Sequence, residues 1–294
     1  MKKDNLDLSV IILSFNTVDL TRECLKSVFA SKLGDLSMEV IVCDNASADN
    51  TDQMVLHEFP NVKFIQNGEN IGFAAGNNKG IKIAKGRNIL LLNSDTEVSN
   101  TALSVMVKFM DSHPDAGAAT CRLLLKDGTM DPACHRGFPS PWVALTYITK
   151  LERLFPRCKL FGEYHQGYKD LHKEHTVDCI SGAFFMVRRE VIDDVGLLDE
   201  DYFMYAEDID WAFRIRRKKW NIWFVPSVST LHKKKQSGRS NILKKRRVKS
   251  EIYFHRNNWL FYKKHYASIY GPLINGIINT IYTLRLFLLE TFSI

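Results

Sequence analysis

The first 120 residues alternate between short apolar runs and longer segments with helical spacing. Apolar residues recur every three or four positions at 19–30, 49–58, 72–84 and 101–112, which predicts helices there. Between these segments, continuous apolar and β-branched runs are typical of strands buried on both faces of a sheet. These runs lie at 8–13, 40–43, 62–65, 89–92 and 116–120. The alternation predicts an α/β fold with a mostly parallel central sheet flanked by helices.

The rest of the chain contains fewer regular elements. Asp127-Gly128 is typical of a hairpin turn, and residues 139–175 are aromatic-rich and poorly periodic, which favours an irregular insertion. The patterns further along predict two strands, a helix that begins at Glu207, and a helix of aromatic and basic residues. Their ranges are 176–187 and 221–225 for the strands and 250–266 for the last helix.

Polar residues stand where four of the predicted strands end. The carboxyl ends of parallel strands meet at one edge of a sheet, and ligands bind beyond that edge. Asn, Asp and Ser also cap helices, which explains any one of these clusters alone but not all four together. The clusters are Ser14-Phe15-Asn16, Asp44-Asn45-Ala46-Ser47, the stretch 67–72, and Asn93-Ser94-Asp95.

Composition and cysteine spacing indicate the class of protein and the compartment in which it folds. The 294 residues are 45% hydrophobic and 25% charged, as in one folded, enzyme-sized unit. Six cysteines occur without a Cys-x-x-Cys pair, and Cys43 and Cys179 lie in apolar runs, as free core cysteines do. The apolar run near the N-terminus is short and leads into a strand pattern, so it does not resemble a signal peptide. We therefore expect a cytoplasmic protein.

The net charge of +7 comes from one segment. Residues 214–250 contain fourteen Lys or Arg and no Asp or Glu, which leaves 26 basic against 33 acidic residues elsewhere. This basic run fits a lid over a diphosphate, an anionic membrane or lipid acceptor, or a solvated face. Residues 266–284 carry no charge and suit an interfacial helix, a re-entrant piece or an oligomer contact. We favour peripheral attachment to the inner face of the membrane.

Motifs in a fixed order run from residue 8 to residue 266. They are LSVIILSFN, VIVCDNASADNT, NIGFAAGNNKGI, ILLLNSDTEV, the long stretch DCISGAFFMV to IRRKKW, and the histidine of STLH. In this the chain resembles the family 2 glycosyltransferases, which have the Rossmann-like GT-A fold, and within them bacterial rhamnosyltransferase-type enzymes. The resemblance implies an inverting, metal-dependent transfer of a sugar, with rhamnose favoured. The donor would be a nucleotide diphosphate sugar, and the acceptor a hydroxyl of a glycan or glycolipid in cell-surface polysaccharide synthesis.

The resemblance also implies which side chains bind the nucleotide. Asp44 would read the pyrimidine edge with Asn45 and Ser47 nearby, and Gly72 would let the backbone approach phosphate at the start of a helix. The full set of nucleotide-binding residues is Ser14, Phe15, Asn16, Asp44, Asn45, Ser47, Asn70, Gly72, Phe73, Asn78, Asn93 and Asp95.

The same resemblance assigns a metal site and a base. Asn93-Ser94-Asp95 occupies the place of the family's Asp-x-Asp motif but begins with Asn, so Asp95 would be its carboxylate ligand for Mg²⁺ or Mn²⁺, with His232 completing the shell. Glu97 would be a spare carboxylate or a helix-start residue. Glu207 and Asp208 are the candidate catalytic carboxylates, with Asp208 as the general base. Asp210 we expect to pair with Arg214 one turn further on.

These assignments divide the chain and leave two rival functions. We expect a GT-A catalytic domain at 1–250, with a nucleotide-binding half at 1–120 and an acceptor half at 121–250, followed by a helical extension at 251–294. A nucleotidyltransferase would carry a Gly-rich basic loop after the first strand, where this chain has SFNTVDLTREC. A nucleic-acid-binding protein would use the basic run with Trp220 and Trp223, but it leaves the polar strand ends unexplained. We therefore expect no nucleic-acid partner.

Overall fold

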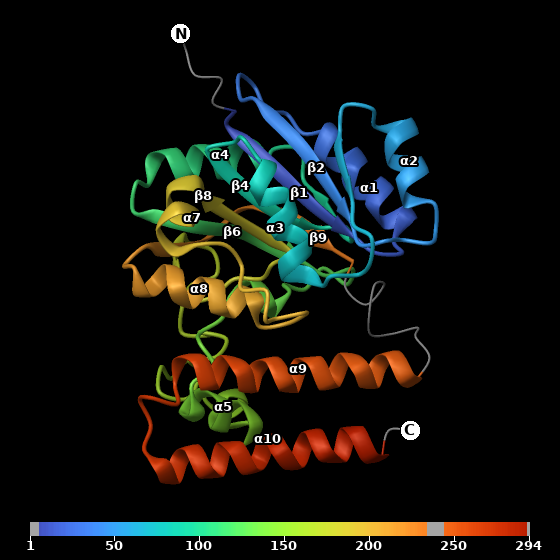
Figure 1. The fold of residues 1–294 in the computed structure, drawn as a ribbon. Helices are drawn as coiled ribbons and strands as arrows, with labels where there is room; N and C mark the ends of the chain where they lie inside the picture. Colours follow the sequence, from blue (N-terminus) through green and yellow to red (C-terminus); the bar gives the residue numbers. More distant parts are fainter. Residues whose placement is uncertain (1–5, 234–243, 293–294) are drawn as a thin grey trace.

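The computed structural model describes residues 6–233 and 244–292. Its core is a nine-stranded sheet in the order β3-β2-β1-β4-β8-β6-β9-β5, with β7 paired to β9 beside this path (Figure 1). The strands are β1 (Leu8–Ser14), β2 (Met38–Asp44), β3 (Lys63–Gln66), β4 (Asn88–Asn93), β5 (Thr96–Val98), β6 (Ala116–Leu124), β7 (His175–Val177), β8 (Phe184–Arg188) and β9 (Asn221–His232).

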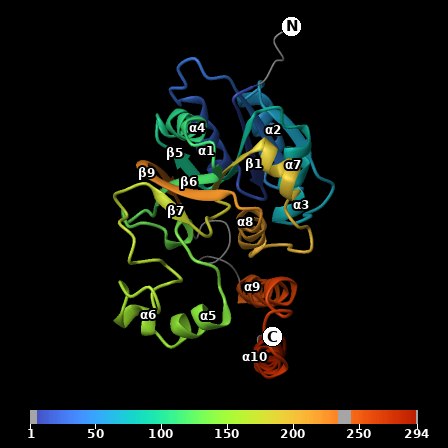
Figure 2. The ribbon, with the colours of Figure 1, turned by 90° about the vertical axis from the view of Figure 1, so that its left-hand side faces the viewer.

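Helices cover both faces of this sheet. Figure 2 shows α1 and α4 on one face and α3, α7 and α8 on the other. This change of side follows from strand order, because β4 lies on the opposite side of β1 from β2 and β3. The helices are α1 (Val18–Phe29), α2 (Thr51–Glu58), α3 (Phe73–Ile83), α4 (Ala102–Ser112), α7 (Arg189–Val195) and α8 (Glu207–Arg217).

The expected α/β class is confirmed, and the four strands β1 to β4 pair in parallel as predicted. The sheet is mixed beyond β4, because β8 runs antiparallel to both β4 and β6. The single strand predicted at 176–187 is wrong: it is two strands, β7 and β8, separated by a turn that contains Ser181 and Gly182. The hairpin turn at Asp127-Gly128 is confirmed, with Gly128 at a φ of 80°.

Other boundaries differ from the predictions for local reasons. β9 extends to His232, beyond the predicted 221–225, since Pro226 lies where the pairing with β6 shifts register rather than at the strand's end. The stretch 139–175 is not wholly irregular, because Ser140 caps the short helix α5 (Pro141–Ile148), which is followed by α6 (Leu151–Leu154). Residues 96–98, where Glu97 was considered for a helix start, form the edge strand β5.

Two long helices form the C-terminal extension, at the end of the molecule opposite the N-terminus (Figures 1 and 2). α9 (Lys244–His265) packs on the body of the protein through the buried ring of Phe261. The amide of Asn257 on α9 donates a 2.8 Å hydrogen bond to the Met204 carbonyl. α10 (Pro272–Phe292) lies against α9, and most of its apolar side chains are exposed. By length and composition alone, its residues Pro272–Thr291 could cross a membrane.

A buried carboxylate joins α9 to α8. Asp210 accepts hydrogen bonds from Arg214 Nε at 2.7 Å, as predicted, and its other oxygen lies 2.6 Å from Nε2 of His265 on α9. Burial by itself would raise the pKa of Asp210, but the hydrogen bonds from His265 and Arg214 outweigh it and lower the pKa below the usual 3.8. The ionised carboxylate therefore stabilises the folded protein.

We predict that Asp210→Ala lowers the free energy of unfolding by roughly 3–5 kcal/mol, because it leaves Arg214 and His265 without their buried partner. Urea unfolding followed by circular dichroism measures this change. Since the folded pKa is depressed, the contribution of Asp210 is present above the unfolded pKa of about 3.9 and is lost as pH falls through the folded value. The difference between wild type and variant should therefore shrink in acid.

Asp194→Ala is the matched control for this measurement. Asp194 pairs with Lys218 on the surface at 2.8 Å, with 38% of its side chain exposed. Exposed pairs contribute at most about 1 kcal/mol. Equal effects of the two substitutions would contradict a special role for the Asp210 network.

Candidate active site

The ends of β1 and β2 are joined through Ser47. Its hydroxyl donates to Oδ1 of Asp44 at 2.5 Å and accepts from the backbone N–H of Asn16 at 2.8 Å. The second oxygen of Asp44 accepts from the Ser47 N–H and from Nε2 of Gln66. Asn16 has a φ of 53°, and its own side chain accepts from the N–H of Ala48. The structure thus brings Asn16, Asp44 and Ser47 together.

A second group of amides follows β2 and β3. The Nδ2 of Asn45 donates to Oδ1 of Asn70 at 3.1 Å and to the carbonyl of Gly72 at 3.0 Å, while its oxygen accepts from Asn67. Oδ1 of Asn70 also accepts from the N–H of Gly72. Three of the predicted residues, Asn45, Asn70 and Gly72, are therefore in direct contact. They form a fixed polar loop in front of α3.

Gly72 approaches another part of the backbone closely. A Cβ at this position would lie 2.5 Å from the carbonyl oxygen of Phe203, and φ is +88°. The same carbonyl accepts a 2.7 Å hydrogen bond from the N–H of Phe73, the first residue of α3. The close approach of the segment before α8 therefore requires a glycine at this position. The approach of this backbone to a phosphate group, which the resemblance implies, stays a prediction.

Asn78 has a different environment from the other predicted nucleotide-binding residues. Its side chain is buried, and Nδ2 donates to the carbonyl of Leu198 and to Glu200, while Oδ1 accepts from the Leu198 N–H. All of these partners belong to the loop after α7. In this structure the amide of Asn78 holds that loop against α3.

The remaining predicted residues surround the ends of β1 and β4. The Ser14 hydroxyl lies 3.2 Å from the hydroxyl of Thr17, which lies 3.1 Å from that of Ser94. Phe15 is 43% exposed at the rim. The backbone N–H of Asn93 donates to the carbonyl of Ala183, just before β8. These contacts tie the Asn93-Ser94-Asp95 motif to β1 on one side and to β8 on the other.

Asp95 and His232 face each other as the sequence predicts. Both are buried, and Oδ1 of Asp95 lies 3.4 Å from Nε2 of His232. The pairing of β5 with β9 brings them together, since β5 begins one residue after Asp95 and β9 ends at His232. On the other side of the imidazole, Nδ1 lies 2.8 Å from a carboxylate oxygen of Asp131.

Two carboxylates flank His232 and favour its protonated form, so a metal ion would bind Nε2 only with loss of that proton. Burial alone would lower the pKa of the imidazole, but the hydrogen bonds to Asp131 and Asp95 outweigh it and raise the pKa to about 9. An imidazole held between two carboxylates in this way resembles the carboxylate–histidine–metal arrangement, in which the outer carboxylate fixes the ring.

The Asp95–His232 pair fits a divalent ion. Two ligands about 2.1 Å from one ion at roughly 90–110° lie about 3.0–3.4 Å apart, which matches the observed separation. Within residues 6–233 and 244–292 no group of three or more His, Cys, Asp or Glu could hold a metal. The described chain therefore offers two ligands, and phosphate and water oxygens would complete the shell, as Mg²⁺ commonly requires.

The two candidate catalytic carboxylates occupy different environments at the start of α8. Oδ2 of Asp208 accepts a 2.9 Å hydrogen bond from the Arg136 guanidinium and a 3.3 Å hydrogen bond from the N–H of Gly182. Its side chain is 15% exposed. Glu207 is more deeply buried, and within the described residues its Oε2 has no hydrogen-bond partner. Only Asp208 is therefore open to a substrate.

Burial raises the pKa of Glu207 well above its usual range, and the neighbouring Asp208 carboxylate adds to this. Glu207 therefore favours its protonated form, whereas Asp208 is held by an arginine and is the less buried of the two carboxylates.

Sequence reasoning missed three residues of this site: Asp131, Arg136 and Gly182. Asp131 is 101 residues from His232, and Arg136 is 72 residues from Asp208, so no local pattern relates them. Gly182 leaves room for the Phe73 ring, which would lie 2.9 Å from a Cβ at that position. A possible signal for Asp131 was its position before Pro132, where it caps a short 3-10 helix.

A sheet of this order, with the polar ends of its strands gathered at one edge, is the GT-A fold of glycosyltransferases. The chain belongs to glycosyl transferase family 2, whose family model matches residues 9–196. The fold and the family implied by the sequence motifs are therefore confirmed. Membership of this family also sets aside the nucleotidyltransferase and nucleic-acid-binding alternatives.

Relatives of known name are moderately similar. The chain is 28% identical to an N-acetylglucosaminyl-diphospho-decaprenol L-rhamnosyltransferase of Mycobacterium tuberculosis, over 68% of each chain. It is 25% identical to the rhamnosyltransferase WbbL of Escherichia coli, over 79% of this chain and 85% of the relative. Among solved structures, a mannosyltransferase from Pyrobaculum calidifontis with GDP-Man and Mn²⁺ superposes with a TM-score of 0.61 at 16% identity. That match covers 98% of this chain and 71% of the other.

We predict that Gly72→Ala destabilises the protein by about 1–3 kcal/mol or more, because an L-residue at this φ is strained and its Cβ would overlap the Phe203 carbonyl. Gly68→Ala is the control, since nothing lies within 4 Å of a Cβ there, and we expect a change within about 0.5 kcal/mol. Urea titration of both variants tests the difference. A neutral Gly72→Ala would mean that the contact with Phe203 does not fix this loop.

Proposed function

We propose that this glycosyltransferase is an inverting, metal-dependent enzyme that moves a sugar from a nucleotide diphosphate donor to an acceptor hydroxyl. The observation that carries the proposal is the turn Ser181-Gly182-Ala183. Its Ala183 carbonyl accepts from Asn93 beside the Asp95–His232 pair, and its Gly182 N–H donates to Asp208. A single turn thus lies between the candidate metal ligands and the candidate base.

The donor nucleotide would bind at the ends of β1 and β2. Asn16, Asp44, Asn45, Ser47, Asn70 and Gly72 form hydrogen-bonded groups there. Their mutual hydrogen bonds hold the polar atoms in place before a ligand arrives, which lowers the cost of ordering them on binding. Phe15 at the rim is exposed, and its ring offers a face on which the nucleobase of the donor could stack.

Asp95 and His232 would hold a Mg²⁺ or Mn²⁺ ion, and Asp131 would keep the imidazole oriented toward it. Such an ion neutralises the charge that develops on a leaving diphosphate. The chain's own carboxylate count at this point is low, because Asn93 stands where the family pattern has its first acidic residue. We therefore propose that nucleotide and metal bind together.

Asp208 would remove the proton from the acceptor hydroxyl. Arg136 and the Gly182 N–H fix one of its oxygens, which orients the carboxylate. Glu207 is more deeply buried, and the rise in its pKa favours the protonated form, which makes it the weaker candidate for the base. A single displacement, with the base on one face of the sugar and the leaving diphosphate on the other, inverts the anomeric centre.

The names of two relatives indicate a sugar and a class of acceptor. Two of the bacterial relatives are rhamnosyltransferases by name, and the name of one gives a sugar linked through diphosphate to decaprenol as its acceptor. We propose rhamnose as the sugar and a lipid-linked or glycan acceptor in cell-surface polysaccharide synthesis.

We also propose a peripheral position on the inner face of the membrane. The exposed apolar side of α10 supports it, since a helix long and apolar enough to span a membrane is almost unburied here. Part of the basic run, residues 234–243, lies outside the described residues. In this proposal 1–250 is the catalytic domain, with halves at 1–120 and 121–250, and 251–294 is the extension that contacts the membrane or a second copy.

We predict that binding of a nucleoside diphosphate depends on a divalent ion and on Asp95. Calorimetry with dTDP, UDP and GDP, with and without Mn²⁺, should show metal-dependent binding to the wild type and none to Asp95→Ala. Asp131→Asn should lower the apparent metal affinity by about 10–100-fold, since the ring of His232 loses its ionised partner. Unchanged affinity in Asp95→Ala would overturn the metal assignment.

We predict that Asp208→Asn retains donor binding but lowers turnover by about 10²–10⁴-fold, because the amide keeps the size of the carboxylate and lacks its basic lone pair. Release of nucleoside diphosphate in the presence of acceptor measures turnover. Asp194→Asn, a surface change, serves as the control. A variant within threefold of wild type would move the base to another residue, and a product with retained anomeric configuration would refute the single displacement.

A further inference from the structure

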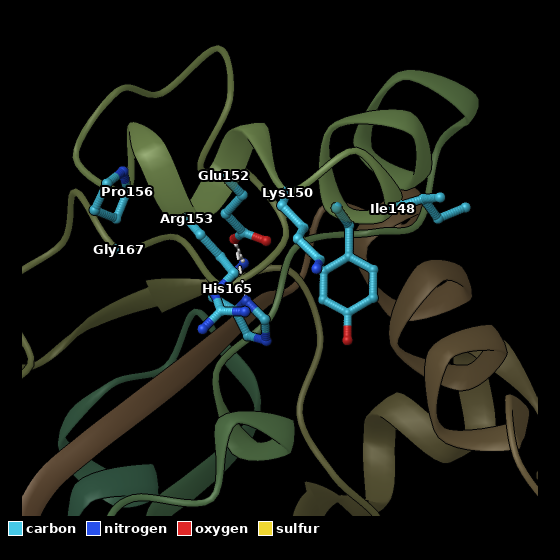
Figure 3. A pocket seen from close by; sticks show the side chains of 8 residues that line it. Ile148, Lys150, Glu152, Arg153, Pro156, His165 and Gly167 are labelled. Atoms are coloured by element: carbon cyan, nitrogen blue, oxygen red, sulfur yellow. Dashed lines mark hydrogen bonds and ion pairs between the residues drawn. The ribbon is translucent and has the colours of Figure 1, made fainter.

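A cavity of about 570 Å³ opens beside α5 and α6, within the stretch 139–175 (Figure 3). Its wall comes from the end of α5, from α6 and from the segment 165–167. Lys150 lies on one side of the opening, and Arg153 lies over His165 on the other (Figure 3). None of the predicted nucleotide, metal or base residues lines it.

The acidic side chain of this cavity has hydrogen-bond partners, whereas its two basic side chains are exposed. The one acidic lining residue, Glu152, is buried, and its Oε1 accepts from the backbone N–H of His165 at 2.8 Å and lies 3.1 Å from its ring Nδ1. Lys150 and Arg153 are exposed, and within the described chain neither side chain has an ion pair or a hydrogen bond. Lys150 also has a φ of 61°, a costly conformation for a lysine. Two available cations therefore converge on one opening.

The cavity is connected to the candidate base through side chains. The ring of Tyr147 packs on that of Tyr164, with centroids 4.8 Å apart. Burial raises the pKa of the Tyr164 phenol against an opposing effect of the adjacent Arg136, the residue that holds Asp208 at 2.9 Å. The backbone of Tyr164 also accepts from Gly137. The contacts Tyr147–Tyr164, Tyr164–Arg136 and Arg136–Asp208 thus connect the cavity wall to the candidate base.

Apolar side chains surround the cavity on the outside. Ile148 and Leu154 are 73% and 71% exposed, and Leu145, Phe155 and Leu160 are exposed near them. α10 presents further exposed apolar residues at the same end of the molecule (Figures 1 and 2). Burial, with a contribution from the nearby Tyr164, raises the pKa of Tyr282 on α10 to about 12.

We propose that this cavity binds the phosphate groups of an amphiphilic acceptor. Lys150 and Arg153 would contact the phosphates, Tyr147 would pack against the acceptor sugar that extends toward Asp208, and the apolar chain would lie along the exposed residues of α5, α6 and α10. Phosphate on paired cations, sugar on an aromatic ring and a hydrocarbon tail on an apolar surface are each matched by chemistry in the cavity or at its rim. The inference rests on the proposed glycosyltransferase function.

The test compares two double variants of the full chain with the same change in charge. Lys150→Ala/Arg153→Ala removes the cavity cations, whereas Arg157→Ala/Lys159→Ala removes two exposed cations of the same segment that do not line the cavity. Calorimetry with farnesyl diphosphate in EDTA, which keeps the probe away from any metal site, should show binding to wild type. We expect at least tenfold weaker binding in the first variant and a change within twofold in the second.

Three further probes separate the sources of binding. Inorganic pyrophosphate and farnesol should each bind at least tenfold more weakly than farnesyl diphosphate, because each supplies half of the ligand. Equal affinity for pyrophosphate would mean that the cavity binds free phosphate groups, and it would overturn the proposal that the ligand is amphiphilic. Flotation with phosphatidylglycerol vesicles should change equally in the two variants. A selective loss in the cavity variant would instead identify a site for membrane phospholipid.

The same protein distinguishes failure of this inference from failure of the proposed function. Both variants should retain Mn²⁺-dependent binding of a nucleoside diphosphate, since Lys150 and Arg153 lie outside that site. No nucleotide binding by wild type would refute the proposed function. Two outcomes with intact nucleotide binding would refute the acceptor site alone. In one, both variants bind farnesyl diphosphate equally well. In the other, neither the wild type nor the variants bind it.

Discussion

Antiparallel pairing of β8 with β4 is the constraint on which the active-site region depends. In such a pair the start of one strand lies beside the end of the other, so the turn that enters β8 must pass the point where β4 releases Asn93 and Asp95. That turn carries Gly182, whose N–H reaches Asp208. A parallel strand in the same place would have delivered its polar end there and its entering turn to the opposite edge. The reversal of one strand therefore brings residues from two distant motifs to one edge.

Local pattern was enough to predict the half of the fold that repeats strand and helix. Each of the strands β1 to β4 has its own apolar run and each helix its own spacing, so the polar ends of β1, β2 and β4 could be placed together from the sequence. The Asp95–His232 contact also followed, but only because a family resemblance named both residues. The contacts of Asp131 and Arg136 could not be predicted, since each joins segments whose proximity is decided by β6, β7 and β9 pairing.

Short elements were the other source of error, for energetic reasons. A three-residue strand such as β5 has almost no periodicity of its own and exists because β9 offers it a partner. In the same way α5 and α6 are too short to be stable alone and depend on their packing with one another and with the segment around Tyr164. Elements of this kind are products of tertiary structure, and here one pair of them forms the wall of a charged cavity.

The hydrogen bond between His265 and Asp210 couples the C-terminal extension to α8, the helix that carries the candidate base. α8 carries Asp208 in its first turn and Asp210 half a turn later, so the carboxylate that anchors α9 and the candidate base belong to one helical segment. A displacement of α9 would remove one of the two charged or polar partners of this buried carboxylate and leave Arg214 as the other. A change in how α9 packs on the body of the protein would therefore be transmitted through Asp210 to the first turn of α8, where the candidate base lies.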